Sequence, residues 1–501
     1  MDNKLILKTC ISSAFVLMFM IMACTTKTKK VHPIVKGFVY LNDKTFMIDS
    51  ATFFPLAINY KIDLIVDSDK IGIAPYKGYY DNEKFPDQHI DSNRNRLEAD
   101  IALIKKSGFN TIRLITLGQT EIVNNQLYIR TQVNNNYDSL LLLTDEGNLK
   151  KYFACVQLVF DVLKKYNMKA IMLAETKIGE PQGEVFLQKL FTNFSNENTI
   201  LAYDLYNEPL YFDSAKHDKK QAMNIAIRWQ QLIDTYAPYH LSTIGLASSR
   251  EVLNWDPNVM AVDFISFHPY EYELNQVLSE IYWYSKHMEK PWIIGETSLP
   301  ADDDSIPYAA QSEFALKTYN QVCNCGGSGY SWWQYKDVAW GDFHPDYMGI
   351  LNRKGTTVSN GITMPGTLKP VASVFASLTN SKKNAACLKP DNYYSFSQHP
   401  DYLTTGTIHD DKDLPLEGAI IIGWNHDWSK LLHTYSKADG SFELKTNFEV
   451  KTAGISATKF MTIIRYEVSS SFAFINNRHL DAGVIRLEPL SVDILNNSMR
   501  N

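Results

Sequence analysis

Several features that define specialised protein classes are scarce in this sequence of 501 residues. Six cysteines are too few for a disulfide-stapled scaffold, and no collagen-like repeat, heptad repeat or low-complexity tract is present. Positive charge is not in excess either, because the net charge is −6 whereas binding a polyanion needs a basic surface. We therefore expect a globular protein with a sizeable core and no nucleic-acid partner.

The N-terminal apolar stretch is too short for the roughly 20 residues of a membrane-spanning helix. It runs from Ile11 to Ala23, follows two lysines and precedes Cys24, an order typical of a signal peptide. Residues 21–24 resemble the lipobox of bacterial lipoproteins. That resemblance implies a signal peptide at 1–23 and a lipid on Cys24, which would tether the protein extracytoplasmically, at a periplasmic face or the cell surface. The alternative is an ordinary secretory signal with an incidental cysteine.

The cysteines of the mature chain are interpreted as structural. Cys323 and Cys325 are close in sequence, but no second cysteine pair accompanies them, so we expect neither a metal nor a redox site there. The other two are Cys155 and Cys387.

Strand-like and helix-like patterns alternate over most of the chain, which favours a parallel sheet. Eight strands are expected, and eight strands in such an alternation predict a closed (β/α)8 TIM barrel over 36–379. The expected strands are Phe53–Tyr60, Thr111–Ile115, Ala170–Leu173, Ile200–Tyr206, Ser242–Leu246, Val262–Phe267, Trp292–Gly295 and Gly329–Trp333. A hairpin around Asn42–Lys44 follows the linker 24–35 and is expected to close the bottom of the barrel.

The pattern changes after a second linker, 380–394. Short strands separated by turn residues predict a small antiparallel β-sandwich over 395–501. Its segments Gly406–Ile408, Leu414–Ala419 and Ala438–Phe442 resemble the carboxypeptidase regulatory-like fold. A spacer or packing role is favoured, with sugar binding by Trp424 or Trp428 as the alternative.

Polar and aromatic side chains follow the expected strands, where a barrel of this kind places its active site. Glu208 ends the strand-like segment before Pro209, and Glu296 ends the one that begins at Trp292. Two carboxyls can share one glycosidic bond, one donating a proton to the leaving oxygen while the other attacks the anomeric carbon. The other residues of this predicted rim are Asn59, Tyr60, Arg113, Thr116, Glu175, Asn207, Ser248, His268, Tyr270, Trp332 and Trp333.

Five motifs in this order resemble the clan A glycoside hydrolases, most nearly family 5, which holds cellulases and mannanases. They are Gly108–Arg113, Asn207–Pro209, His268–Tyr270, Gly295–Glu296 and Trp332–Trp333. The resemblance spans Lys36 to about Leu378. It implies that Glu208 is the acid/base and Glu296 the nucleophile of a retaining enzyme that needs no metal and no cofactor.

The resemblance also implies supporting roles. Asn207 would bind the 2-hydroxyl of the sugar, and Arg113 and Tyr270 would flank Glu296 and keep it ionised. His268 would orient Glu208 or a hydroxyl. The pKa of Glu208 should be raised by burial and by the neighbouring charge.

Trp332 or Trp333 would form the floor of the sugar subsite. Because neighbouring strand residues point to opposite faces, we expect one ring of the pair to reach the barrel mouth.

Two features depart from the family pattern. Family 5 enzymes often carry a histidine near the end of strand three, where this chain has Leu173–Thr176, so Glu175 is either a substrate contact or a rival to the assignment. The insert 62–95 is long and should narrow the cleft, favouring short chains or terminal sugars.

The predicted function is a retaining β-glycosidase acting on β-linked gluco- or manno-configured saccharides. The alternative is an inactive carbohydrate-binding surface lipoprotein. The sugar, the choice between exo and endo action, and the oligomeric state do not follow from the sequence.

Overall fold

The computed structural model describes residues 34–67, 70–76, 90–133, 136–270, 274–338, 347–378, 385–394, 399 and 401–491. The predicted signal peptide and Cys24 lie outside these residues, as do parts of both predicted linkers. Within the described ranges, no helix combines the length and the apolar character required to cross a bilayer.

Eight parallel strands form a closed barrel, which confirms the predicted fold class. Each strand pairs with the next in chain order, and the last pairs with the first through Tyr330 beside Leu56. The strands are β4 (Leu56–Asp67), β6 (Thr111–Ile115), β10 (Lys169–Leu173), β11 (Ile200–Asn207), β12 (Leu241–Leu246), β13 (Ile265–Phe267), β14 (Trp292–Ile294) and β15 (Gly329–Trp332).

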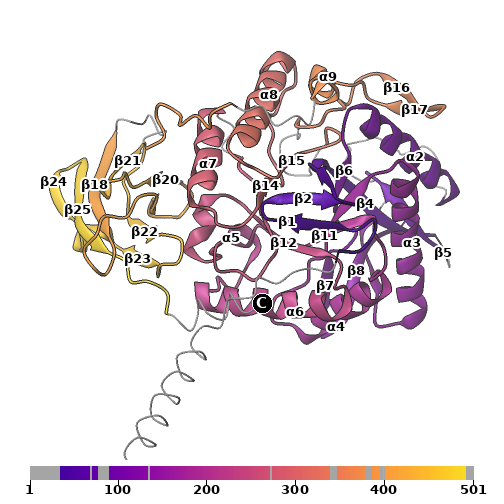
Figure 1. Cartoon of the computed structure of the whole chain (residues 1–501), viewed down its shortest axis with the longest axis horizontal. Helices are drawn as coiled ribbons and strands as arrows, with labels where there is room; N and C mark the ends of the chain where they lie inside the picture. Colours follow the sequence, from indigo (N-terminus) through magenta and orange to yellow (C-terminus); the bar gives the residue numbers. More distant parts are fainter. Residues whose placement is uncertain are drawn as a thin grey trace, which may run out of the picture.

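Helices surround the barrel (Figure 1). They are α2 (Ile90–Lys106), α3 (Glu146–Lys165), α4 (Pro181–Asn193), α6 (Lys219–Tyr236), α7 (Leu274–His287), α8 (Tyr308–Asn324) and α9 (Pro370–Ser377), with the short α5 (Pro209–Phe212) and the 3-10 helix η1 (Ser249–Leu253). The sequence of α6 carries a clear start signal, because the side chains of Asp218 and Gln221 cap each other's backbone N–H groups.

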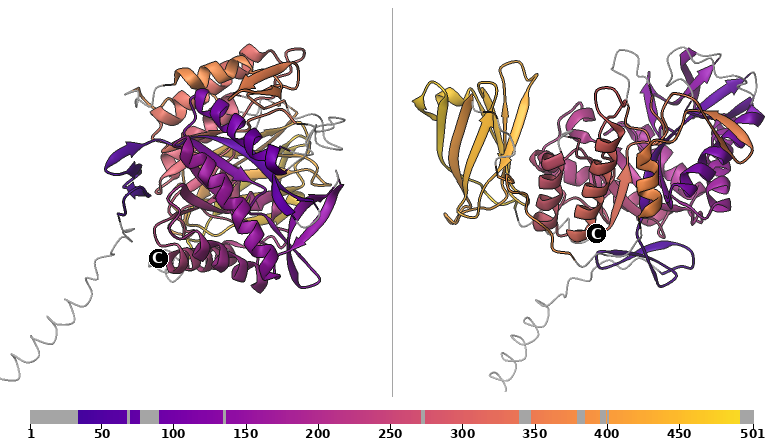
Figure 2. Two further views of the ribbon diagram at one scale, coloured as in Figure 1. Left: turned by 90° about the vertical axis from the view of Figure 1, so that its right-hand side faces the viewer. Right: turned by 90° about the horizontal axis from the view of Figure 1, so that it is seen from above.

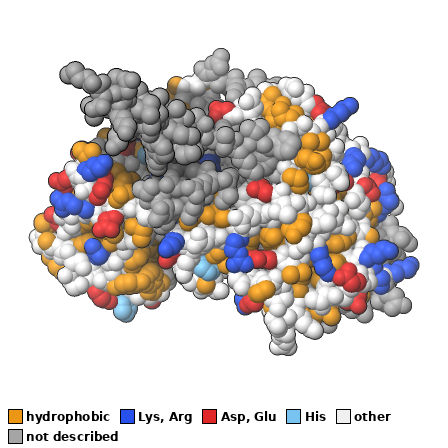
Figure 3. All heavy atoms as spheres, turned by 60° about the horizontal axis from the view of Figure 1, so that its bottom comes forward, with side chains coloured by type: hydrophobic (Ala, Val, Ile, Leu, Met, Phe, Trp, Pro, Cys, Tyr) orange, Lys and Arg blue, Asp and Glu red, His pale blue; other side chains and the backbone are white. Residues whose placement is uncertain are grey.

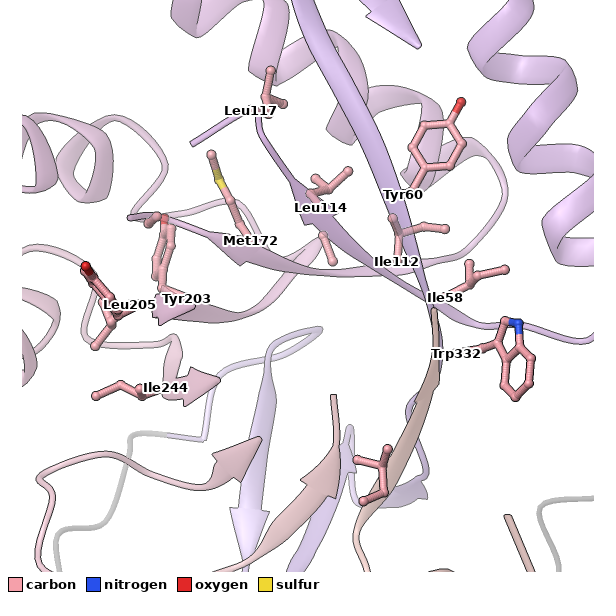
Figure 4. Packing of buried hydrophobic residues seen from close by; sticks show 14 of the residues in the cluster. Ile58, Tyr60, Ile112, Leu114, Leu117, Met172, Tyr203, Leu205, Ile244 and Trp332 are labelled. Carbon is pink, nitrogen blue, oxygen red and sulfur yellow. The ribbon is translucent and has the colours of Figure 1, made fainter. Parts of the chain in front are cut away.

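The barrel strands are short and apolar because both of their faces are covered. All five residues of β6 are buried, including the charged Arg113. The side chains that face the helices form one continuous core (Figure 4). Ile58, Leu114 and Met172 belong to it.

The N-terminal hairpin closes the bottom of the barrel, as predicted. Its strands are β1 (Val39–Asn42) and β2 (Thr45–Ile48), and β3 (Ala51–Phe53) pairs with β2. Phe46 and Val39 are buried in a separate apolar cluster with Ile171 and Phe264 of the strands above. The right-hand view of Figure 2 shows this indigo hairpin at one end of the barrel.

A second sheet lies at the opposite end of the barrel. Strand β4 continues past its barrel partners and pairs with β5 (Lys70–Pro75) and β8 (Gln126–Val133), while β7 (Thr120–Val123) and β9 (Asn136–Leu142) flank β8. The insert after the first strand therefore begins as a hairpin rather than as a loop. Strands β7 to β9 were not predicted from the sequence.

The C-terminal domain is a β-sandwich of two four-stranded sheets. One sheet holds β18 (Tyr402–His409), β21 (Ser441–Thr446), β24 (Ala473–Asn476) and β25 (His479–Arg486); the other holds β19 (Ile420–Trp424), β20 (Leu431–Tyr435), β22 (Thr452–Ser456) and β23 (Ile463–Tyr466). The predicted β-sandwich is confirmed, and its strands pair antiparallel except for β18 and β25, which pair in parallel. The sandwich has its own apolar core.

The sandwich lies beside α7 of the barrel (Figures 1 and 2). A disulfide between Cys325, at the end of α8, and Cys387 ties the segment that leads to the sandwich to the barrel. This bond was not predicted from the sequence. Basic and acidic side chains are interspersed on the face in Figure 3.

Candidate active site

Two glutamates meet at the carboxyl end of the barrel. Glu208 directly follows β11, and Glu296 lies two residues after β14. One carboxylate oxygen of each, together with one ring nitrogen of His268, lie within 4.8 Å of one another. Little of either glutamate side chain is exposed, 12% for Glu208 and 6% for Glu296.

Glu208 has an unusual backbone conformation. Its φ of 45° and ψ of 67° are left-handed, and Pro209 takes the first position of α5. A residue before proline is disfavoured in the right-handed helical region, and the left-handed region costs on the order of 1–3 kcal/mol for a residue with a side chain. The Glu208 N–H donates to the Gly245 carbonyl at 2.8 Å, which attaches this turn to the neighbouring strand.

Arg113 of β6 connects most of the polar residues of the site. Its Nη1 donates to Glu296 Oε1 and, at 2.9 Å, to Asn59 Oδ1. Its Nε donates to Asp204 Oδ2 at 2.9 Å, and its Nη2 to Asn207 Oδ1 at 2.8 Å. Although burial alone would lower the pKa of Arg113, the charges of Asp204 and Glu296 raise it. A permanent cation therefore lies beside Glu296.

The two glutamates have different side-chain partners. The Tyr270 hydroxyl donates to Glu296 Oε2 at 2.7 Å. The Nδ1 of His268 lies 3.0 Å from Glu208 Oε1 and 3.7 Å from Glu296 Oε1. The other ring nitrogen lies 3.4 Å from Ser266 Oγ.

Two glycines allow the His268 ring to enter this space. A Cβ on Gly245 would lie 2.6 Å from the ring, and one on Gly295 would lie 1.8 Å from Ser266 Oγ and 2.8 Å from the ring. Since real Cβ contacts are not this short, a side chain at either position would displace His268. Gly295 of the Gly-Glu motif is thus needed because a larger residue would not leave room for Ser266 and the His268 ring.

Burial affects the ionisation of all three groups. It raises the pKa of Glu208 to about 7 and also raises that of Glu296, while it lowers the pKa of His268 to about 4. His268 is therefore neutral near pH 7 and cannot hold either glutamate ionised by its charge. Arg113 and Tyr270 oppose the effect of burial at Glu296. Of the two carboxyls, Glu208 is thus the better place for a single proton.

Asn59, at the end of the barrel part of β4, is another residue of the predicted rim. Its Oδ1 accepts from Arg113, and its Nδ2 donates to the Gly295 carbonyl at 3.0 Å and to Ser331 Oγ at 3.1 Å. The amide thus fixes both Arg113 and the strand end that carries Glu296.

Glu175 lies beside the site but contacts the backbone. Its Oε2 accepts from the Asn207 N–H at 3.2 Å, and burial raises its pKa to about 7. It supports the segment that carries Asn207, and the close pair of carboxyls is formed by Glu208 and Glu296.

The tryptophan pair separates as alternation predicts. Trp332 is fully buried: its ring packs against Phe314 and Phe375, and its Nε1 donates to the Met348 carbonyl at 3.0 Å. Figure 4 shows it with Ile58 among the side chains outside the barrel. Its inclusion among the sugar-binding candidates was wrong, because it belongs to the layer between strands and helices. Trp333 is the member of the pair that is left as a candidate.

Lys61 was not predicted and lies against Trp333. Its ammonium is 5.1 Å from the centre of the Trp333 ring, and its side chain is buried. It follows Asn59 by two positions on β4 and so lies on the same face of that strand. Tyr60, between them, points to the helices, where its hydroxyl donates to Asp100 at 2.5 Å.

Asp204 was also missed, although the sequence contains a signal. It is a lone charged residue inside the apolar run of β11, and a buried charge of this kind needs a partner. Its partner is Arg113, which lies on another strand and was predicted from the sequence to contact Glu296 only.

The same three groups are the candidate metal ligands among the described residues: Glu208, His268 and Glu296. The near oxygen of Glu296 already accepts from the Arg113 guanidinium, and the other from Tyr270. A metal ion at this point would have to lie beside a fixed cation, so the donor set fits proton transfer better than metal binding.

No model of a known protein family matches the sequence, and no curated protein matches it. Solved structures do match the fold. A β-D-glucuronidase of Dictyoglomus thermophilum is 13% identical, with 69% of this chain and 55% of that chain covered and a TM-score of 0.45. A glycoside hydrolase family 5 mannosidase from Rhizomucor miehei is 13% identical, with 68% and 96% covered and a TM-score of 0.42.

The chain spans about half the length of the first glucuronidases that it matches. Similarities of this size concern the fold alone, so the function has to be argued from the side chains.

Proposed function

We propose that the protein is a retaining β-glycosidase in which Glu208 is the general acid/base and Glu296 the nucleophile. The observation that carries the proposal is the pair of carboxyl groups of Glu208 and Glu296. One oxygen of each lies within 4.8 Å of the other, both groups lie at strand ends, and their hydrogen-bond partners differ. Retaining enzymes place their carboxyls about 5–5.5 Å apart, whereas inverting enzymes leave about 6.5–9.5 Å for a water. The separation supports retention.

The partners support the division of roles. Glu296, beside Arg113 and Tyr270, attacks the anomeric carbon while Glu208 donates its proton to the leaving oxygen, and a glycosyl-enzyme ester forms. Glu208 then accepts a proton from the water that attacks the same carbon, which releases the sugar and restores both carboxyls. Neutral His268, within hydrogen-bond distance of Glu208, orients it in both protonation states.

The substrate class rests on the sequence resemblance and on the surroundings of the site. We infer a β-linked gluco- or manno-configured sugar, with Trp333 as an aromatic surface for it and Asn207 near its 2-hydroxyl. The sheet formed by β5, β4, β8 and β7 borders the site end of the barrel and favours short chains or terminal sugars.

We also propose that the chain is anchored by a lipid on Cys24. This rests on the sequence alone. Labelling cells with a radioactive fatty acid should mark the wild-type protein, and Cys24→Ala should lose the label and leave the membrane fraction. An unchanged label on Cys24→Ala would refute the anchor without affecting the proposed activity.

The activity is tested on a panel of aryl β-glycosides and short oligosaccharides. The wild-type chain should hydrolyse at least one member, and Glu296→Gln should lose on the order of 10⁴-fold or more in kcat/KM, as expected for a lost nucleophile. Glu180→Gln, a glutamate next to α4, is the matched control and should keep full activity. Sugar binding without hydrolysis would favour an inactive carbohydrate-binding protein instead.

A further inference from the structure

Glu251 links two loops of the active-site end. It lies in η1, is fully buried, and its Oε1 accepts from the Leu210 N–H at 2.9 Å and from the Ala247 N–H at 3.2 Å. Leu210 is the second residue after Glu208, and Ala247 directly follows β12. One carboxyl oxygen thus joins the turn that carries Glu208 to the neighbouring strand end.

The position of Leu210 affects that of Glu208 directly. Only Pro209 separates them, and its ring fixes one of the backbone dihedrals between them. The left-handed conformation of Glu208 persists only where the surroundings enforce it. The bond from Glu251 is one such constraint, and the Glu208 N–H to Gly245 carbonyl bond is another.

The helix that carries Glu251 is itself held from the C-terminal sandwich. Ser249 donates its N–H to Glu280 Oε2 at 3.0 Å and its hydroxyl to Glu280 Oε1 at 2.9 Å. The Ser249 hydroxyl also lies 2.9 Å from the Tyr435 hydroxyl of β20. His433, also of β20, places its Nε2 2.8 Å from Glu280 Oε1. All four side chains are buried.

The contact between the barrel and the C-terminal sandwich includes a buried charged group. Burial alone would raise the pKa of Glu280, but the hydrogen bond and charge of His433 lower it to about 2, so a buried charge depends on a residue of the sandwich. Thr462 of the sandwich also donates to the Leu253 carbonyl at 2.6 Å, at the other end of η1. Breaking one partner out of such a set leaves buried polar groups unpaired.

We propose that Glu251 is a positioning residue for Glu208 and that the C-terminal sandwich keeps Glu251 in place through Ser249 and Glu280. The catalytic part of this inference rests on the proposed function. The sandwich then helps to position Glu208, which goes beyond the spacer or packing role expected from the sequence.

The chain offers a conservative variant and a control. Burial raises the pKa of Glu251 to about 8, so glutamine matches its neutral form near pH 7 and keeps the acceptor for both amides. Glu251→Met removes the acceptor, and His433→Leu removes the sandwich partner of Glu280. His479→Leu is the matched control, because His479 bonds Thr405 inside the sandwich.

The first measurement compares kcat/KM on a dinitrophenyl glycoside, whose leaving group needs no proton, with that on the phenyl glycoside, which needs one. Glu251→Met should lose roughly 10- to 100-fold more on the phenyl substrate, the scale of a small misplacement of a catalytic group. His433→Leu and Ser249→Ala should shift the ratio in the same direction. Glu251→Gln and His479→Leu should leave the ratio unchanged.

The second measurement needs no activity: hydrogen exchange of the 209–212 segment by mass spectrometry. Exchange should be faster in Glu251→Met, His433→Leu and Ser249→Ala, and unchanged in Glu251→Gln and His479→Leu. If the wild type hydrolyses nothing, the proposed function fails while this measurement still decides the positioning role. An unchanged exchange rate in the folded Ser249→Ala and His433→Leu variants would overturn the part assigned to the sandwich. An unchanged rate or substrate ratio in Glu251→Met would overturn the whole inference.

Discussion

Glu208 and Glu296 are the same residue type at the same end of one barrel, yet they are held differently. Glu296 accepts side-chain hydrogen bonds from a cation, Arg113, and from Tyr270. Among the described residues, the side chain of Glu208 has one such partner, the neutral His268, and its place is set by the backbone of a left-handed turn. The ionised form is therefore favoured more strongly at Glu296 than at Glu208, which is the division that the proposed nucleophile and proton donor require.

The largest expected effect is a difference in the reaction intermediate that accumulates when either glutamate is replaced. On a dinitrophenyl glycoside, Glu208→Gln should still release the phenol and then accumulate a glycosyl-enzyme, because only the second step needs its base. Its steady-state rate should fall by about 10²–10⁴-fold. Intact-protein mass spectrometry should find the adduct in Glu208→Gln. An adduct in Glu296→Gln instead would mean that the roles are reversed.

Gly295→Ala should have the next largest effect, because its Cβ would meet Ser266 and also His268, whose Nδ1 lies near both glutamates. We expect a loss of about 10²-fold in kcat/KM and of ~1–3 kcal/mol in unfolding free energy, the cost of overpacking. Urea titration and steady-state kinetics measure the two. Gly147→Ala is the control, because a Cβ on Gly147 would meet only the Asp145 carboxylate oxygen, at 3.1 Å. Equal losses of kcat/KM and of unfolding free energy in Gly295→Ala and Gly147→Ala would show that Gly295 is not needed to make room for His268.

The pH dependence tests the protonation assigned to Glu208. Its pKa is raised to about 7, and the carboxyl must be protonated for the first step, so kcat/KM should fall about tenfold per unit as pH rises above 7. In Glu208→Gln this alkaline limb should vanish for the phenyl substrate, whose leaving group needs the proton. If the limb persisted there, another group would be the acid.

Tyr270→Phe should have the smallest effect of the series. It removes one hydrogen bond to Glu296 while Arg113 keeps its own. A loss of about tenfold in kcat/KM is expected, near the lower end for a bond to a charged group. Tyr128→Phe, which removes a surface bond to Gln126, should change nothing. A much larger loss would show that Tyr270, rather than Arg113, dominates at Glu296.

Most of the barrel could be predicted from the sequence because its strands are buried on both faces and read as short apolar runs. β7 and β9 could not, because they are partly exposed and exist through pairing with β8, which itself pairs with the extension of β4. The disulfide was missed for a similar reason: Cys325 and Cys387 are 62 residues apart and are joined by the fold rather than by local pattern.

The candidate site was predictable where the strand pattern alone places a residue, as for Glu208 and Glu296, which each follow a strand, and for Arg113, which lies within one. It was not predictable where a residue acts across strands or domains. Asp204 pairs with Arg113 from another strand, and Glu251 reaches Leu210 from a short helix that the sequence analysis did not single out. For Trp332 and Trp333 the alternation was clear, but which ring faces inward depends on the register with β4.

The central claim is that Glu208 and Glu296 form a retaining pair, and the anomeric configuration of the first product tests it most directly. Proton NMR during early hydrolysis of a reactive β-glycoside should show the β-anomer first, with the α-anomer appearing later by mutarotation. An α-anomer formed first would show inversion and would contradict the roles given to both glutamates.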